Sequence, residues 1–330
     1  MKDHTTADTP ANPTTRAGAQ DANRGKFQDP KRTADGQDRA TVALNTPQTL
    51  WFNTGTLCNI ACLRCYIDSS PTNDALVYLS LSEVTDYLDQ LEHRAWGVRE
   101  IAFTGGEPFM NPDMLAMAEA ALTRGYEVLI LTNAMRPMMR PRGQRGLVDL
   151  NTRFTGKMTL RVSLDHHARA CHDEERGTGS YDITLEGMRW LRDAGIAMAV
   201  AGRSLWTETE SETRAGYAAV FKSERFEIDA QSPSMTVIFP EMDMSVEVPE
   251  ITTACWGILD TSPDSVMCSS SRMVVKRRGA DRPAVLACTL LPYDPQFELG
   301  HTLEEAESPV ALNHPHCAKF CVLGGASCSA

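Results

Sequence analysis

Residues 58–66 read CNIACLRCY, and the three cysteines in this stretch, Cys58, Cys62 and Cys65, have the spacing C-x3-C-x2-C. Thiolates are the usual protein ligands of iron–sulfur clusters, and three of them can hold a four-iron cluster whose fourth iron has no protein ligand. An open metal position can bind a substrate, as catalytic zinc sites do. The spacing alone also fits a partial zinc knuckle, so the rest of the sequence must decide.

The composition is that of a folded protein with metal chemistry. In a chain of 330 residues, 42% hydrophobic content is enough to bury a substantial core, and the length indicates about two structural units. The net charge of −11 argues against nucleic acid as the main partner. No apolar run approaches the roughly 18 residues of a membrane span, and the N-terminus lacks the apolar stretch of a secretory signal. We therefore expect a cytoplasmic protein without membrane contact, in which ten cysteines favour metal ligation over disulfides.

The distribution of apolar residues divides the chain into three parts. Residues 1–45 contain almost no large apolar side chains, so we expect a disordered tail. Over residues 46–250, apolar runs alternate with amphipathic stretches, which predicts β-α units around a parallel sheet. Residues 251–330 are rich in loops and contain six cysteines, which predicts a small unit held by metal.

Individual elements of the middle part can be placed by their patterns. The expected strands are residues 50–53, 100–103, 127–131, 158–164, 196–200 and 235–239. Ser80 and Glu83 form a capping box before an apolar helical face, and further helices are expected at residues 112–124, 182–194 and 209–222. The cysteine loop follows the first of these strands.

A second motif, Thr104-Gly105-Gly106-Glu107-Pro108, follows the second expected strand. Over residues 48–245 or so, the cysteine loop and this GGEP motif resemble the radical S-adenosylmethionine (SAM) superfamily. The resemblance implies a partial (β/α)6 TIM-like barrel with SAM bound to the open iron of a [4Fe-4S] cluster, which Cys58, Cys62 and Cys65 hold. It also implies contact between the GGEP segment and the amino group of SAM, which suits two glycines and a carboxylate.

Polar residues at the expected strand ends complete the predicted SAM site, because catalytic groups of such barrels gather there. The expected SAM contacts are Tyr66, Thr104, Gly105, Gly106, Glu107, Asn133, Ser163, Asp165, Arg176 and Arg203. Arg176 or Arg203 is expected to pair with the SAM carboxylate, although a salt bridge within the loops explains either arginine equally well. Arg64 departs from the family, which usually has an aromatic or apolar residue near the adenine at this position. Its guanidinium can stack on an adenine instead.

The second cysteine group resembles a SPASM or twitch domain, with an opening hairpin over residues 268–300. The resemblance implies an auxiliary [4Fe-4S] cluster, for which we expect Cys268, Cys288, Cys317 and either Cys321 or Cys328 as ligands. Four thiolates suit a structural zinc ion as well, so that alternative stays open. Cys255 is not assigned to the cluster, and three roles stay open for it: a ligand, a core thiol or a residue near the substrate.

The expected function is reductive cleavage of SAM to a 5′-deoxyadenosyl radical that abstracts hydrogen from a substrate, with a net oxidation assisted by the auxiliary cluster as one outcome. The absence of a leader-binding module before the barrel favours a small-molecule substrate, and a peptide is the alternative. The expected electron donor is a protein such as flavodoxin or ferredoxin. Asp229, Glu241 and Asp243 are weak candidates for a substrate base, since exposed acids are usually only solvated. A non-catalytic iron–sulfur carrier would explain the cysteines but not the GGEP motif.

Overall fold

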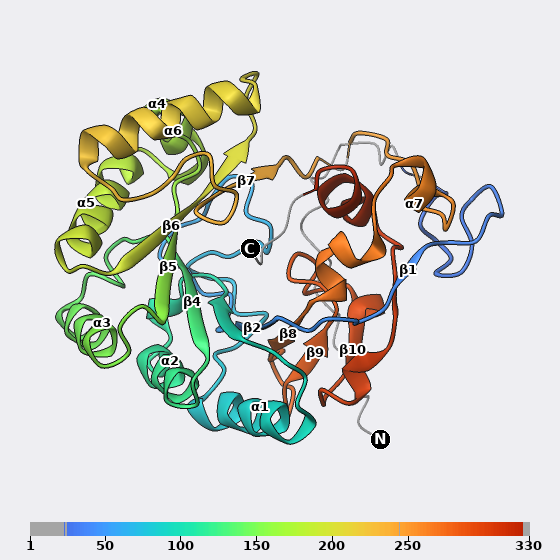
Figure 1. Cartoon of the computed structure of the whole chain (residues 1–330), viewed down its shortest axis with the longest axis horizontal. Coiled ribbons are helices and arrows are strands. Elements are labelled where there is room, and N and C mark those ends of the chain that lie inside the picture. Colours follow the sequence, from blue (N-terminus) through green and yellow to red (C-terminus); the bar gives the residue numbers. More distant parts are fainter. Residues whose placement is uncertain (1–22, 24, 244, 326–330) are drawn as a thin grey trace, which may run out of the picture.

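Six parallel strands form a partial barrel in the computed structural model, which describes residue 23, residues 25–243 and residues 245–325 (Figure 1). In spatial order the strands are β2 (Thr49–Asn53), β3 (Glu100–Thr104), β4 (Glu127–Thr132), β5 (Met158–Ser163), β6 (Ala197–Ser204) and β7 (Thr236–Pro240). The connecting helices are α1 (Leu81–Arg94), α2 (Met114–Thr123), α3 (Pro141–Arg153), α4 (Arg169–Arg176), α5 (Ser180–Asp193) and α6 (Glu210–Glu224), which lie on the outer face. The predicted barrel of six strands is confirmed.

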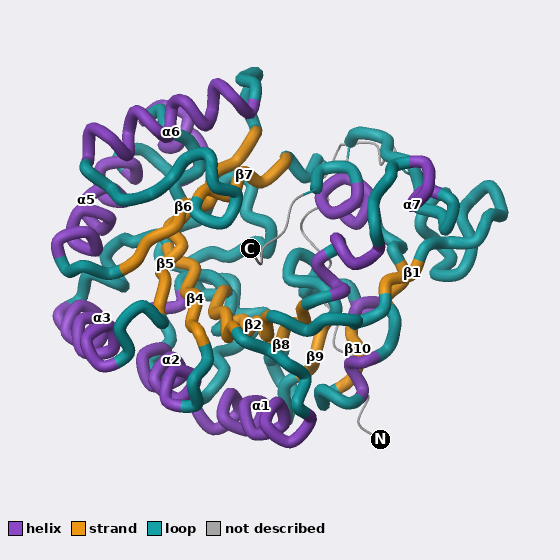
Figure 2. The backbone as a smooth tube through the Cα atoms, viewed as in Figure 1, coloured by secondary structure: helices purple, strands orange, loops and turns teal. Residues whose placement is uncertain are grey.

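The sheet continues beyond the barrel into the cysteine-rich part of the chain (Figure 2). Strand β8 (Ser271–Val275) pairs in parallel with β2, β9 (Ala284–Leu286) pairs antiparallel with β8, and β10 (Glu298–Gly300) pairs antiparallel with β9. The predicted hairpin is therefore present. The boundary proposed near residue 250 is not a break in the sheet, because β8 hydrogen-bonds directly to the first barrel strand.

Local signals explain which helices were predictable. Helix α1 begins at the capping box of Ser80 and Glu83, and α6 begins at a second capping box. Helices α3 and α4 were not predicted as such. Both lack a side-chain cap, and their buried residues are few: Gly143, Leu147 and Leu150 in α3, and His172 and Glu175 in α4.

The expected disordered tail does not hold for its described part, residue 23 and residues 25–45. Strand β1 (Thr41–Val42) pairs with β11 (Val310–Ala311), and Arg39 forms a buried ion pair with Glu250. These partners are more than 200 residues away in the sequence, so local composition could not reveal them. Residues 1–22, 24, 244 and 326–330 lie outside the described residues.

Two apolar layers hold the sheet in place. Leu50 and Phe52 of β2 pack toward the helices, whereas Trp51 faces the layer shared with the C-terminal part, as alternation along a strand requires. That second layer also contains Cys268, Cys317 and Phe320. The sequence predicted no membrane contact, and none of the helices in the described ranges has the length and apolar character needed to cross a bilayer.

Candidate active site

A cavity of about 160 Å³ lies at the carboxyl ends of the barrel strands. Its lining brings together Cys58, Cys62 and Cys65 with seven of the ten expected SAM contacts: Tyr66, Thr104, Gly105, Gly106, Asn133, Ser163 and Arg176. Of the described cysteines, only the first three line it. The sequence-predicted cluster loop and most of the predicted SAM site therefore share one cavity.

The cysteine loop suits a metal cluster. The amide of Ser69 donates to Cys65 Sγ (3.3 Å), and the side-chain amide of Asn133 lies 3.9 Å from Cys58 Sγ. Burial raises the pKa of Cys58 to about 12 and also raises that of Cys62, so these thiols stay protonated without a cation. A bound metal supplies the positive charge that deprotonates a coordinating thiol. Buried thiols with N–H donors aimed at sulfur thus fit an iron–sulfur cluster.

The glycines of the GGEP motif let the end of β3 lie against the cysteine loop. The amide of Gly106 donates to the carbonyl of Gly55 (2.8 Å), and that of Glu107 donates to Leu57 (3.1 Å). A Cβ on Gly106 would lie 2.2 Å from the Leu57 carbonyl oxygen, and Gly105 has a φ of +139°. Neither position accepts a side chain in this arrangement.

Glu107 does not line the cavity, although it is part of the predicted motif. Its buried carboxylate accepts hydrogen bonds from the Asn133 amide (2.9 Å), the Thr132 hydroxyl (2.9 Å) and the Phe109 amide (3.2 Å). Burial raises the pKa of Glu107 to about 7, and these hydrogen bonds oppose the rise. In this structure the carboxylate joins the end of β3 to the end of β4, and its contact with SAM stays a prediction.

Asp165 and Arg176 form a buried bidentate pair with distances of 2.8 and 2.9 Å. Burial acts to raise the pKa of Asp165, but the Arg176 guanidinium outweighs it and holds that pKa below its usual value. Arg176 lines the cavity, whereas Asp165 lies behind it. The positive charge of Arg176 also acts to lower the pKa of Cys62. Asp165 therefore orients the arginine that faces the cluster loop.

Arg64 and Arg203 share a second buried carboxylate, that of Glu175. Arg64 forms an ion pair with Glu175 and lies 3.8 Å from Glu241, while Arg203 Nη1 lies 3.3 Å from Glu175 and donates to the Arg64 carbonyl (2.8 Å). Arg203 also lies over the Tyr66 ring, 4.6 Å from its centroid. Arg203 does not line the cavity, so in this structure both arginines fasten the cysteine loop to α4 and β6.

The three weak candidates for a substrate base lie in different places. Asp229 precedes β7, at the amino end of the strand, where it accepts a hydrogen bond from the Gln231 amide (2.8 Å). That end of a parallel strand lies opposite the cavity, so the structure argues against Asp229. Glu241 and Asp243 follow β7 on the cavity side, and Asp243 accepts hydrogen bonds from Ser245 that lower its pKa.

The C-terminal part closes one wall of the cavity. Thr289 and Leu290, directly after Cys288, line it together with Phe239. Tyr293 donates to the carbonyl of Ile67 (2.9 Å), which ties this segment to the cluster loop. Thr289 and Leu290 were missed in the sequence, and their position next to a predicted ligand cysteine was the only available signal.

The second cysteine group lies around this wall. Cys268 and Cys317 are buried, Cys288 follows β9, and Cys317 and Cys321 belong to the π-helix Cys317–Val322. Burial raises the pKa of Cys317, and the nearby Cys288 and Cys268 add to the rise. Cys328 lies outside the described residues. Cys255 begins helix α7 (Cys255–Ile258) and contacts the Thr252 amide (3.4 Å).

The described cysteines of the two groups do not come together as a compact set of thiols. Among the described residues, no three cysteine sulfurs lie within 4.8 Å of one another. Thiolates around a tetrahedral zinc ion, with bonds of about 2.3 Å, are about 3.8 Å apart. The described cysteines therefore do not form a preassembled tetrahedral zinc site.

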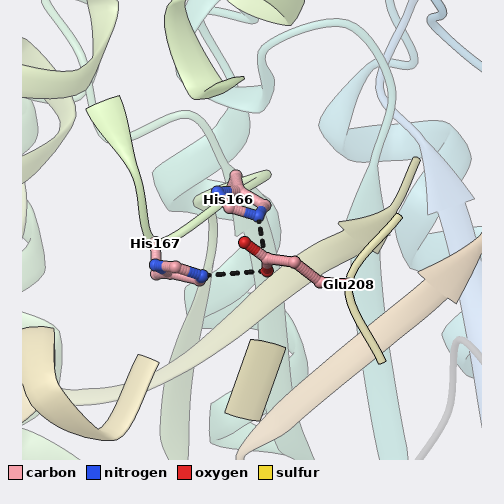
Figure 3. Close-up of side chains that lie close together, drawn as sticks. All are labelled: His166, His167 and Glu208. Carbon is pink, nitrogen blue, oxygen red and sulfur yellow. Dashed lines mark hydrogen bonds and ion pairs between the residues drawn. The ribbon is translucent and has the colours of Figure 1, made fainter. Parts of the chain in front are cut away.

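His166, His167 and Glu208 form a compact group beside the barrel mouth (Figure 3). Both Nε2 atoms lie 3.0 Å from Glu208 Oε2. The Ala168 amide donates to His166 Nδ1 (3.0 Å), so the proton of the neutral ring is on Nε2, and that atom has no lone pair for a metal. The geometry is therefore that of a hydrogen-bonded unit joining the loops after β5 and β6.

Comparison with known proteins agrees with the fold and the cavity. A family model of the radical SAM superfamily matches residues 52–206, and this part of the chain belongs to that superfamily. Over 154 residues the chain is 30% identical to the antilisterial bacteriocin subtilosin biosynthesis protein AlbA of Bacillus subtilis, covering 45% of this chain and 32% of AlbA. It is 27% identical over 157 residues to the AdoMet-dependent heme synthase of Methanosarcina barkeri, covering 47% of this chain and 42% of the heme synthase.

The fold is also that of solved radical SAM proteins. Streptococcus suis SuiB, whose structure contains bound S-adenosylmethionine, superposes with a TM-score of 0.55 and 12% identity, covering 78% of this chain and 63% of SuiB. SuiB has also been solved with the precursor peptide SuiA. The matched region spans less than half the length of either of these two curated relatives.

Proposed function

We propose that this protein is a radical SAM enzyme that reductively cleaves SAM and abstracts hydrogen from a second substrate. The observation that carries the proposal is one cavity in which three thiols, two glycines and the polar ends of β4 and β5 meet. When bound there, a four-iron cluster and SAM supply one electron and a 5′-deoxyadenosyl radical, which takes hydrogen from an unactivated carbon.

The residues around the cavity would bind the cluster, orient SAM and shield the radical from water. Cys58, Cys62 and Cys65 are the cluster ligands, and Gly105 and Gly106 let an ammonium approach the backbone. Asn133, Ser163 and Thr104 offer hydrogen bonds to polar groups of SAM. Arg176, held by Asp165, pairs with a carboxylate. Apolar residues exclude water and other hydrogen donors from the cavity: Trp51, Tyr66, Leu131, Phe239 and Leu290.

The second cysteine group is proposed to hold one auxiliary [4Fe-4S] cluster. Cys268, Cys288, Cys317 and either Cys321 or Cys328 are the proposed ligands. Support comes from the neighbouring positions of Cys268, Cys288 and Cys317, of which Cys288 and Cys268 both act on the pKa of Cys317. Because Thr289 and Leu290, directly after Cys288, line the main cavity, a cluster held by this group would lie beside the cavity and could accept an electron from a substrate bound there.

For the substrate we propose a peptide, with a small molecule as the second candidate. The bacteriocin biosynthesis protein AlbA supports a peptide, and the heme synthase supports a small molecule. The expectation of a small molecule rested on a disordered tail, and that reason no longer holds, because β1 pairs with β11 and Arg39 pairs with Glu250. Precursor peptides encoded by neighbouring genes and iron porphyrins are the two substrate sets to compare, with product masses as the readout.

Anaerobic reconstitution followed by SAM and dithionite tests the reaction itself. The parent is expected to bind about eight irons per chain, four at each cysteine group, and to form 5′-deoxyadenosine. Cys58→Ala should abolish 5′-deoxyadenosine formation. Cys171→Ala, in α4 and outside both cysteine groups, is the matched control and should behave like the parent. No 5′-deoxyadenosine from the parent, or full activity of Cys58→Ala, contradicts the proposal.

A further inference from the structure

Four exposed arginines lie together between β4 and the first turns of α3: Arg136, Arg140, Arg142 and Arg145. We call them the arginine surface. Among the ion pairs of the described residues, none includes any of these four side chains. By contrast, Arg124 and Arg153, at the C-terminal ends of α2 and α3, each pair with two carboxylates. The arginine surface is thus a local positive region on a chain with a net charge of −11.

A hollow of about 180 Å³ adjoins the arginine surface. Arg140 and Arg142 lie at it, and Arg142 donates to the Pro112 carbonyl (3.0 Å). The remaining lining is mostly apolar: Phe109, Met110, Met114, Leu115 and Pro137. Because Phe109 and Met114 belong to the buried core, the accessible part of the hollow is both polar and apolar.

The arginine surface is on the outside of the segments that line the cluster cavity. Asn133 lies 3.9 Å from Cys58 Sγ, and two residues later Met135 Sδ lies 3.8 Å from the side-chain amide of Asn59. Arg136 is the next residue. On the hollow's other side, Phe109 follows two residues after Glu107, which contacts Asn133. The arginine surface therefore begins one residue beyond Met135, whose side chain contacts the cluster loop.

We infer that the arginine surface docks an acidic protein that delivers one electron to the site at Cys58. Positive charge attracts and orients such a partner, which the rest of the acidic chain repels. The reduced partner loses one electron and the proposed cluster site gains it, which is the electron that SAM cleavage consumes. The inference rests on the proposed function, since an electron is needed only if that reaction occurs.

The test uses the reconstituted enzyme with two acidic carriers, a flavodoxin and a [2Fe-2S] ferredoxin. Calorimetry measures the Kd of each oxidised carrier at low and at 0.5 M salt, and stopped-flow absorbance measures the rate of cluster reduction by each reduced carrier. The double variant Arg136→Glu/Arg140→Glu is expected to weaken binding at least tenfold at low salt and to slow reduction by a similar factor. High salt should weaken parent binding, because exposed charges are screened.

Two matched variants separate charge from structure. Arg136→Lys/Arg140→Lys keeps the charge and should retain most binding. Lys222→Glu/Arg225→Glu reverses two charges at the far end of α6 and should bind like the parent. All variants should cleave SAM normally with dithionite, which needs no docking. Parent-like binding by the Arg136→Glu/Arg140→Glu protein, or failure of both carriers to bind the parent, overturns the inference. Absence of dithionite-driven cleavage in the parent instead contradicts the proposed function.

Discussion

Replacement of Glu175 by glutamine tests whether the cysteine loop depends on a buried carboxylate. The Glu175 side chain is fully buried, and its partner Arg203 is 7% exposed, whereas Arg64 is 35% exposed. Leaving a buried charge without its counter-ion costs about 3–5 kcal/mol. Loss of the partly exposed Arg64 pair adds at most about 1 kcal/mol. Because glutamine still accepts a hydrogen bond, we expect the free energy of unfolding to fall by about 3 kcal/mol.

Urea unfolding of the metal-free, reduced protein at pH 7 measures this loss without any contribution from a cluster. Asp149→Asn is the control, since it removes an exposed i,i+4 pair with Arg153 and should cost about 0.5 kcal/mol. Iron retention after reconstitution should also fall in Glu175→Gln, because Glu175 fastens the Leu63–Arg64 segment. A stability loss within 1 kcal/mol of the control would refute the reasoning.

Three further variants test other parts of the site. Gly106→Ala should lower the free energy of unfolding by about 1–3 kcal/mol and remove most SAM binding, because its Cβ would meet the Leu57 carbonyl. Gly257→Ala, with open space around its Cβ, is the control and should match the parent in urea unfolding and SAM titration. Burial lowers the pKa of His172 to about 4, so the unfolded chain alone takes up this proton below pH 6.5. The free energy of unfolding should therefore decrease as the pH falls, and His172 should account for about 1.4 kcal/mol of the decrease at pH 5.5. The His172→Asn variant should lack this part of the decrease. Equal decreases in the two proteins would contradict the reasoning. Cys317→Ala should bind about four irons instead of eight and still form 5′-deoxyadenosine, and unchanged iron would exclude Cys317 as a ligand.

The parts of the fold that local chemistry determines were predictable. The capping box of Ser80 and Glu83 predicted the start of α1. The cysteine loop and the GGEP motif predicted the position of the cavity, because each motif consists of residues close in sequence. Distant partners were not predictable. Arg39 is ordered by Glu250, and Arg64 is drawn to Glu175, neither of which a local pattern reveals.

Strand ends were a good guide to the site, with a limit. They correctly placed Asn133 and Ser163 at the cavity, since side chains at the carboxyl ends of parallel strands converge. They could not show that Asp165 and Glu107 turn their carboxylates to neighbouring protein groups. Asp229 was misplaced because it precedes β7, at the other end of the barrel.

The parallel pairing of β2 with β8 has a consequence for synthesis of the chain. Thr49 aligns with Ser271, so one edge of the first barrel strand stays uncovered until more than 200 further residues have been made. At ribosomal rates of about 5–20 residues per second, that interval is on the order of 10–40 s. The cysteine loop directly after β2 is therefore translated well before its neighbouring wall exists. Metal insertion into a finished cavity has to wait for the last quarter of the chain, and a truncated product would expose both an open strand edge and reactive thiols.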